Sequence, residues 1–176
     1  MAEYLIVVDM QKDFVDGALG TAEAQAIVPA VAEKIRGFSG EIIVTYDTHE
    51  EDYLDTREGR FLPVPHCIRD TEGWQLNASV AEALADRAYT VVEKPTFGAV
   101  TLPEVVEQLA GDADFTVELI GLCTDICVVS NAMLLKAAFP EVDMTVDAAC
   151  CAGVTPESHQ AALTTMGCCQ IVVTNN

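Results

Sequence analysis

Short apolar runs alternate with amphipathic segments along almost the entire chain. Six runs of four or five residues predict buried β-strands, at residues 4–8, 42–46, 89–93, 116–120, 143–146 and 170–173. Helix-capping residues and apolar spacing predict helices between them, over residues 21–36, 77–88, 102–110 and 156–166 and after Asp125. Strands that alternate with helices form parallel sheets with right-handed crossovers. We therefore predict an α/β fold in a single domain over residues 1–176: a three-layer sandwich with a six-stranded, mainly parallel sheet and helices on both faces.

Ionisable or nucleophilic residues follow four of the predicted strands. Asp9 ends the first strand, Asp47 and His49 end the second, Lys94 ends the third, and Cys127 follows the fourth. The carboxyl ends of parallel strands lie at one edge of the sheet, where ligands bind. Strand ends usually carry turn residues instead, so this set of side chains predicts a functional site at that edge.

Cys127 lies a few residues beyond Gly121, in the sequence GLCTDICV. Thr124 and Asp125 are good helix caps, so we expect Cys127 in the first turn of a helix. Free amide N–H groups and the positive end of the helix dipole gather there, and both stabilise a thiolate over a thiol. The alternative is a small buried hydrophobic residue, which is the commoner role of an intracellular cysteine.

Asp9, Lys94 and Cys127 would together supply the groups that amide or thioester chemistry needs. Cys127 would be the nucleophile, and Asp9 would take its proton and pass it to the departing amine. Lys94 would favour the thiolate and hold the carboxylate, and the backbone N–H groups of Cys123 and Cys127 are candidate oxyanion donors. Taken singly, Asp9 also fits a loop or helix-capping acid, and Lys94 fits a surface ion pair.

A candidate metal site falls in the long polar segment 47–74. Asp47 and His49 are two residues apart at a strand end, so their side chains point to the same face. Glu58 and His66 lie further along this segment, and chain closure could bring them in. Two imidazoles with carboxylates suit Zn²⁺, and also Fe²⁺ or Mn²⁺. On spacing alone this motif is weak, and surface acids with a histidine in a polar loop are the commoner explanation.

Charge and composition restrict the class of ligand. The formal net charge of -19, from 28 acidic against 9 basic residues, would repel nucleic acid and anionic membranes. The apolar runs are too short to span a membrane, and the amino terminus has no basic region followed by an apolar one. An odd number of cysteines, seven, favours a reducing compartment. We expect a soluble cytoplasmic protein that acts on a small neutral or cationic molecule; its composition permits a homo-oligomer.

Two motifs carry a family resemblance. DMQKDF at residues 9–14 and GLCTDICV at residues 121–128, together with Lys94, resemble the nicotinamidase and isochorismatase-like cysteine hydrolases. The resemblance implies that Asp9, Lys94 and Cys127 form the catalytic triad. It also implies a cis peptide bond between Leu122 and Cys123.

The resemblance also implies a substrate and a metal set. Nicotinamidases use an Asp-x-His pair and a later histidine as metal ligands, which fall on Asp47, His49 and His66. The fourth ligand varies, and we choose Glu58 over Asp52 and Asp55. The metal would be Zn²⁺, with Fe²⁺ or Mn²⁺ as alternatives.

The implied activity is hydrolysis of nicotinamide to nicotinate and ammonia through a cysteine thioester, in NAD salvage. Phe14 would pack against the substrate ring, with Trp74 as a second wall. The family commonly has an aromatic residue shortly before the second metal histidine. Here residues 62–65 are Leu-Pro-Val-Pro and Phe61 is the nearest aromatic, so the pocket shape is open. His159, inside a predicted helix, is expected at the surface or at a partner contact.

Two alternatives remain. The first is another hydrolase of the same superfamily that acts on a different small amide or on an enol ether. The second is a non-catalytic α/β module that binds a partner through its acidic surface.

Overall fold

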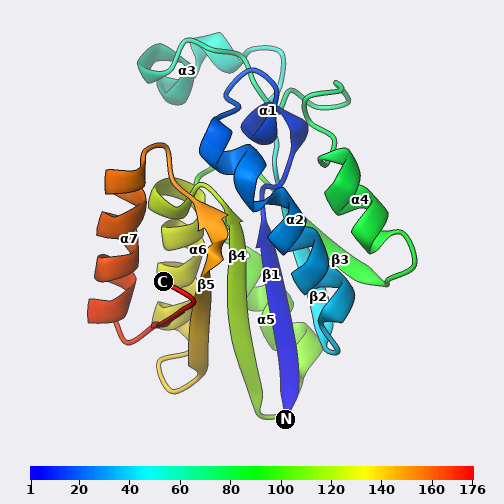
Figure 1. Ribbon diagram of the computed structural model, residues 1–176, viewed down its shortest axis with the longest axis vertical. Coiled ribbons are helices and arrows are strands. Elements are labelled where there is room, and N and C mark those ends of the chain that lie inside the picture. Colours follow the sequence, from blue (N-terminus) through cyan, green and yellow to red (C-terminus); the bar gives the residue numbers. More distant parts are fainter.

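The central feature of the computed structural model, which describes residues 1–176, is a six-stranded sheet (Figure 1). All neighbouring strands run parallel, in the order β3-β2-β1-β4-β5-β6. The strands are β1 (Ala2–Val8), β2 (Glu41–Asp47), β3 (Tyr89–Lys94), β4 (Phe115–Leu122), β5 (Asp143–Ala152) and β6 (Val172–Thr174). The predicted α/β fold with a six-stranded parallel sheet is confirmed.

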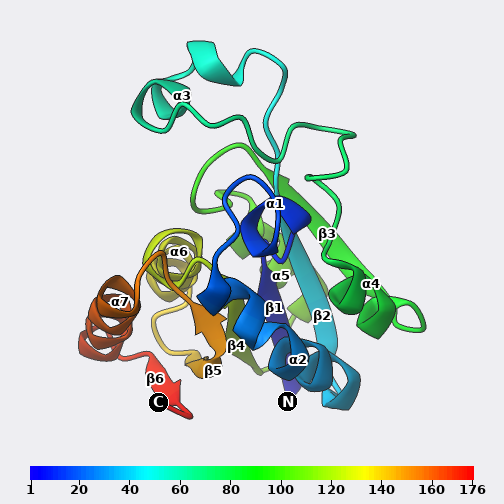
Figure 2. The same ribbon diagram turned by 45° about the horizontal axis from the view of Figure 1, so that its top comes forward.

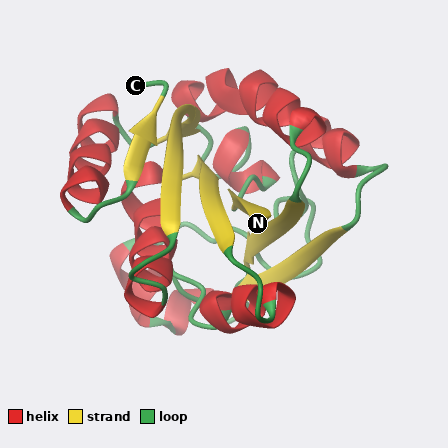
Figure 3. Ribbon diagram, turned by 90° about the horizontal axis from the view of Figure 1, so that it is seen from below, coloured by secondary structure: helices red, strands yellow, loops and turns green.

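Helices cover both faces of the sheet (Figure 3). The α-helices are α1 (Lys12–Val15), α2 (Ala22–Gly37), α3 (Arg57–Phe61), α4 (Ala78–Leu84), α5 (Leu102–Ala110), α6 (Val129–Ala138) and α7 (Pro156–Cys168). Two further turns are the 3₁₀ helix η1 (Tyr53–Asp55) and the π-helix η2 (Thr124–Val128). Helices α2 and α4 pack on one face, and α5, α6 and α7 pack on the other, which gives three layers. No helix is long and apolar enough to cross a membrane.

The residues of β1 explain its central position. All five residues of its apolar run are buried, because side chains alternate between the two faces and helices cover both. Leu5 and Val7 join the core under α2 and α4, whereas Ile6 and Val8 join the core under α5 to α7. A polar residue at any of these positions would face a closed apolar layer.

Element boundaries differ from the predictions where the apolar pattern is weak. Strand β5 runs six residues beyond the predicted 143–146, because Cys151 and Ala152 pair with β4 after a shift in register although they lack β-branched side chains. Strand β6 begins two residues later than predicted, and α4 ends four residues before the predicted position. The short helices α1, α3 and η1 were not predicted, because helices of three to five residues show no periodicity.

The winding of the chain positions the site. The chain passes from β1 through β2 to β3 on one side, and then from β4 through β5 to β6 on the other. The winding direction therefore reverses between the neighbouring strands β1 and β4. Helices α1 and α3 lie beyond the carboxyl ends of the strands (Figure 2). At this edge β4 approaches β1 so closely that a side chain at Gly121 (φ 115°) would collide with the Val8 backbone.

Candidate active site

Asp9, Lys94 and Cys127 meet at the carboxyl edge of the sheet. Lys94 Nζ lies 2.7 Å from Asp9 Oδ2 and 3.5 Å from Cys127 Sγ. It also lies 3.1 Å from Asp47 Oδ1. The side chains of Asp9 and Lys94 are 0% and 1% exposed, so neither is a surface charge. The three predicted residues therefore form a buried acid–amine–sulfur cluster.

The Asp9 carboxylate is held by neighbouring strand β2. Thr45 Oγ1 donates a 2.5 Å hydrogen bond to Asp9 Oδ1, and the Asp9 backbone N–H donates to Thr45 Oγ1 at 3.2 Å. Asp9 has a left-handed backbone conformation (φ 47°), which only a few per cent of non-glycine residues adopt. These contacts leave Oδ2 to face Lys94 and the sulfur.

The turn that carries Cys127 differs from the one expected. Thr124 and Asp125 do not cap the helix; Cys123 precedes a π-helical turn, and its carbonyl accepts from the N–H groups of Ile126 and Val128. The Leu122–Cys123 peptide bond is cis, as the family resemblance predicted. The Cys123 backbone N–H has no hydrogen-bond partner, so it is free to bind a ligand oxygen.

The protonation state of Cys127 also differs from the expectation. Burial, and then the negative charge of Asp9, raise the pKa of the Cys127 thiol well above its usual value, although Lys94 acts in the opposite direction. Burial and the carboxylate therefore favour the thiol, whereas the helix start was expected to favour the thiolate. Burial also raises the pKa of Asp9, which makes its carboxylate a stronger base towards that thiol. The two carboxylates outweigh burial at Lys94 and raise its pKa, so it is an ammonium.

The four predicted metal ligands form one cluster beside this triad. Their ligand atoms all lie within 4.8 Å of one another. Asp47 Oδ2 is 3.0 Å from His49 Nε2 and 3.5 Å from His66 Nε2. Glu58 Oε1 is 3.6 Å from His49 Nε2 and 3.8 Å from His66 Nε2. Ligands about 2.0–2.2 Å from a tetrahedral Zn²⁺ stand about 3.3–3.6 Å apart, so the spacing fits a cation.

Two further observations support a cation at this cluster. His49 Nε2 is buried and, although Asp47 Oδ2 lies 3.0 Å away, it forms no hydrogen bond, which is costly unless the nitrogen binds something else. His66 Nδ1 lies 2.8 Å from the Val64 carbonyl, and donation to it would leave the Nε2 lone pair facing the cluster. Cys67, adjacent in sequence, is buried but is not part of the cluster.

Two further residues of the motif D-x-Q-x-D-F (residues 9–14) hold the backbone near the metal cluster, which was not predicted. Gln11 is fully buried, and its side-chain amide forms two hydrogen bonds with the Asp47 backbone. Gln11 Nε2 donates to the Asp47 carbonyl, and the Asp47 N–H donates to Gln11 Oε1. Asp13 Oδ2 accepts from the Cys67 N–H at 2.8 Å, next to His66. Gln11 holds the backbone of Asp47, and Asp13 holds the backbone beside His66. Their spacing of two and four residues from Asp9 was the available signal.

A cavity of about 280 Å³ connects the triad and the metal cluster. Cys127, Asp47, Glu58 and His66 line it. This volume is near the lower end of the about 300–1,000 Å³ of small-molecule pockets, so the cavity suits a small ligand. A wider groove of about 1050 Å³ lies beside it, and Glu58, Leu62, Phe97 and Ile126 line both.

The aromatic lining is partly as expected. Phe14 lines the cavity and packs edge-on against His66, with ring centroids 5.4 Å apart. The prediction that Trp74 forms a second wall is wrong, because Trp74 does not line the cavity. Its ring packs on Tyr46, and its Nε1 donates to Thr48 Oγ1. Phe97, which lies three residues after Lys94 in the sequence and was not predicted, lines the cavity instead.

Two other residues singled out in the sequence also lie away from the cavity or its lining. Phe61 is 77% exposed, with the Arg57 guanidinium over its ring. His159 is only partly buried, which agrees with its expected place at the surface, and it hydrogen-bonds Thr124; a partner contact stays a prediction.

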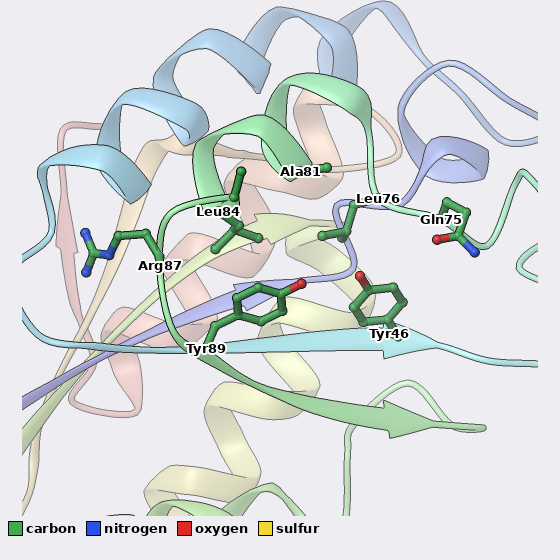
Figure 4. Close-up of a pocket in the computed structure, with 8 residues that line it drawn as sticks. Tyr46, Gln75, Leu76, Ala81, Leu84, Arg87 and Tyr89 are labelled. Atoms are coloured by element: carbon green, nitrogen blue, oxygen red, sulfur yellow. The ribbon is translucent and has the colours of Figure 1, made fainter.

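A second cavity, of about 310 Å³, lies beside α4 near the outer strand β3 (Figure 4). The side chains of Tyr46, Tyr89, Leu76 and Leu84 line it, whereas the Arg87 guanidinium points away. It contains no cysteine, histidine or carboxylate, so it offers no groups for hydrolysis.

The fold and this site define a class: an α/β protein with a buried cysteine, acid and amine beside four metal-type ligands. The model of the isochorismatase domain matches residues 3–176 of the chain. The chain therefore belongs to the isochorismatase family.

Three similar proteins illustrate this family. The chain is 29% identical over 143 residues to an uncharacterized isochorismatase family protein, PncA, from Bacillus subtilis, covering 76% of this chain and 78% of that protein. It superimposes with a TM-score of 0.83 on the zinc complex of Pyrococcus horikoshii pyrazinamidase, at 26% identity and with all of both chains covered. A pyrazinamidase/nicotinamidase from Streptococcus mutans UA159 gives a TM-score of 0.83 at 28% identity, over 98% of this chain and 99% of that one. These relatives support a hydrolase that acts on a small amide.

Proposed function

We propose that this protein is a nicotinamidase, which hydrolyses nicotinamide to nicotinate and ammonia in NAD salvage and uses Cys127 as its nucleophile. One observation carries the proposal: the Cys127 sulfur and three of the four metal-type ligands line the same small cavity. An aromatic amide with a ring nitrogen is a neutral molecule whose carbonyl carbon can react with a nucleophile while its ring nitrogen binds an electrophile. The zinc complex of the similar Pyrococcus horikoshii pyrazinamidase supports a metal in this protein.

The first half of the reaction forms a thioester. Asp9 takes the proton from the Cys127 thiol as the sulfur bonds to the carboxamide carbon. The carbonyl oxygen becomes an oxyanion, which the backbone N–H groups of Cys123 and Cys127 stabilise. Asp9 then gives its proton to the amide nitrogen, the C–N bond breaks, and ammonia leaves.

The second half of the reaction releases the acid. Asp9 takes a proton from water as the water oxygen adds to the thioester carbon. The C–S bond breaks, the sulfur takes the proton from Asp9, and the resting thiol is restored. The product leaves as the carboxylic acid, which loses the second proton of the water to solvent and becomes nicotinate. Lys94 remains an ammonium throughout, where it fixes the Asp9 carboxylate and stabilises the transient thiolate 3.5 Å away.

Asp47, His49, Glu58 and His66 would hold the divalent metal, and Zn²⁺ suits this donor set. When bound, the metal supplies a Lewis acid for the ring nitrogen of the substrate, which orients the ring and withdraws electron density from it. Phe14 and Phe97 supply apolar walls for the ring.

Ammonia release from nicotinamide tests the proposal. Wild-type protein should release ammonia, and Cys127→Ala should not. Cys168→Ala is the matched control, because Cys168 is exposed at the end of α7 and far from this chemistry in the sequence. Equal rates for wild type and Cys127→Ala would refute the nucleophile and would favour a non-catalytic module.

Metal removal separates nicotinamidase activity from the activity of another superfamily hydrolase. Strong chelation should lower turnover of nicotinamide, and added Zn²⁺ should restore it. Full activity in protein shown to hold no metal would favour hydrolysis of a different small amide or of an enol ether.

A further inference from the structure

His159 is the one histidine outside the metal cluster, and it contacts the turn that carries the proposed nucleophile. The Thr124 hydroxyl and His159 Nδ1 are hydrogen-bonded at 2.8 Å, and Thr124 is 0% exposed. Burial lowers the pKa of His159, so its ring is neutral near pH 7. The bond thus joins two neutral groups across 35 residues of sequence.

The next residue of the turn is held from the same side. The Asp125 carboxylate accepts from the Val154 N–H, at 3.1 and 3.3 Å. The side chains of Thr124 and Asp125 therefore do not cap their own helix. Instead, both attach the turn between Cys123 and Cys127 to the segment formed by Val154 and the first turns of α7.

That segment is itself firmly placed. Thr155 and Ser158 form a reciprocal capping box at the start of α7. Helix α7 approaches the end of β5 so closely that a Cβ at Gly153 would lie 2.8 Å from the His159 backbone nitrogen. His159 therefore presents its ring to Thr124 from a fixed position.

His159 does not line the catalytic cavity, and neither does Thr124. Cys123 and Cys127, which flank Thr124 along the chain, do line it. An effect of His159 on the reaction therefore passes through neighbouring residues: through the turn, which its ring contacts, or through Gly153 and Val154, which also line the cavity.

We propose that His159 is a positioning residue: its hydrogen bond to Thr124 holds the turn that aims the Cys123 N–H at the carbonyl oxygen of the substrate and the Cys127 sulfur at its carbonyl carbon. This inference rests on the proposed function. Loss of the bond would leave the buried Thr124 hydroxyl without its partner and allow the turn to shift. A displacement of about 1 Å in a catalytic group can cost about a hundredfold in rate.

Four variants test the inference through kcat and KM for nicotinamide. His159→Phe and Thr124→Val remove the bond, and each should lower kcat by about 10- to 100-fold with little change in KM. His159→Asn keeps a hydrogen-bonding group near the position of Nδ1, and Thr124→Ser keeps the hydroxyl; both should stay within about fivefold of wild type. Thr164→Val is the matched control, because the exposed Thr164 hydroxyl bonds only within α7.

The double variant Thr124→Val/His159→Phe distinguishes positioning from general damage. If the two residues act as one unit, the double variant should be no slower than the slower single variant. Losses that multiply, or a His159→Phe kcat within about twofold of wild type, would overturn the inference. If His159→Phe does not fold, the near-isosteric Thr124→Val and the rescue by Thr124→Ser decide it.

A second readout needs no substrate. Alkylation of Cys127 by iodoacetamide, followed by mass spectrometry with exposed Cys168 as the internal reference, should change by about fivefold or more in His159→Phe. An unchanged Cys127 rate would overturn the inference. This measurement separates the two claims: wild-type protein that turns over no amide defeats the proposed function, whereas the alkylation rates still test the position of the sulfur.

Discussion

Replacing Lys94 by methionine tests the charge arrangement on which the proposed site depends. Methionine has a similar length and no charge, so the main change is loss of the ammonium. In the structure this ammonium is 1% exposed and contacts Asp9 Oδ2 at 2.7 Å and Asp47 Oδ1 at 3.1 Å. The variant would therefore bury two carboxylates without the cation between them.

The expected loss of stability can be worked out in two ways. Removing one partner of a buried ion pair typically costs about 3–5 kcal/mol. Asp9 could instead take up a proton, which at pH 7 costs about 4 kcal/mol for a reference pKa of about 3.9, at about 1.4 kcal/mol per unit. Both routes give about 4 kcal/mol, or a fall in melting temperature of about 8–16 °C for a chain of this size.

Urea unfolding monitored by the fluorescence of the single tryptophan, Trp74, measures this loss. The experiment is done in chelator, so that a metal on Asp47 cannot replace the missing charge. Lys12→Met is the matched control: Lys12 is 39% exposed and lies 3.6 Å from Asp16 and from Glu72. Surface pairs of this kind contribute about 0–1 kcal/mol.

The pH dependence separates charge from packing. In the Lys94→Met variant the folded-state pKa of Asp9 should rise further above its unfolded value, so the variant loses stability as pH rises and regains it as pH falls. At pH 5, protonating Asp9 costs only about 1.5 kcal/mol, so the loss should shrink accordingly. A loss below about 1 kcal/mol at pH 7, or one that is the same at pH 5, would refute the reasoning.

Three further predictions address the base, the metal and the fold. Asp9→Asn should keep the fold by circular dichroism but lower kcat by about 10³-fold or more, because an amide cannot take the thiol proton; residual activity above a tenth of wild type would rule out that role. His49→Ala should lower the zinc bound per chain, measured by metal analysis after dialysis, relative to Asp52→Ala; an unchanged content would refute the ligand assignment. Lys34→Met should cost about 2–3 kcal/mol at pH 7, because Lys34 lies 2.8 Å from the 2% exposed Asp147 carboxylate. Although burial opposes it, hydrogen bonds from Lys34 and Asn175 lower the pKa of Asp147, so the pair stabilises the protein at neutral pH and loses this effect as pH falls below about 4. A Lys34→Met loss that is the same at pH 7 and at pH 3 would contradict this origin.

Strand ends explain why much of the site could be predicted. Asp9, Lys94 and Cys127 each follow an apolar run, and a parallel sheet brings all such positions to one edge whatever the loops do. The Asp47 and His49 pair follows from the same rule. The weaker predictions lay in the long segment 47–74, where Glu58 reaches the cluster from α3, a helix too short to leave a periodic pattern.

Other features depend on contacts that no local pattern records. Trp74 lies outside the cavity because Tyr46 and Thr48 hold it, and Phe97 takes a place on the wall because of the turn after β3. The Thr124–His159 bond arises from how α7 returns beside η2. The thiol state of Cys127 follows from burial among carboxylates, whereas the sequence indicated only a helix start.

The reversal of winding between β1 and β4 has a consequence for assembly. Acid, amine and all four metal-type ligands belong to residues that precede β4, whereas the sulfur belongs to the later portion of the chain. A polypeptide that ended at β3 would contain the acid, the amine and the metal-type ligands, but neither the sulfur nor the proposed oxyanion donors of Cys123 and Cys127. Hydrolysis therefore requires the two portions to be packed together. The time at which turnover appears during refolding would show when β4 pairs with β1.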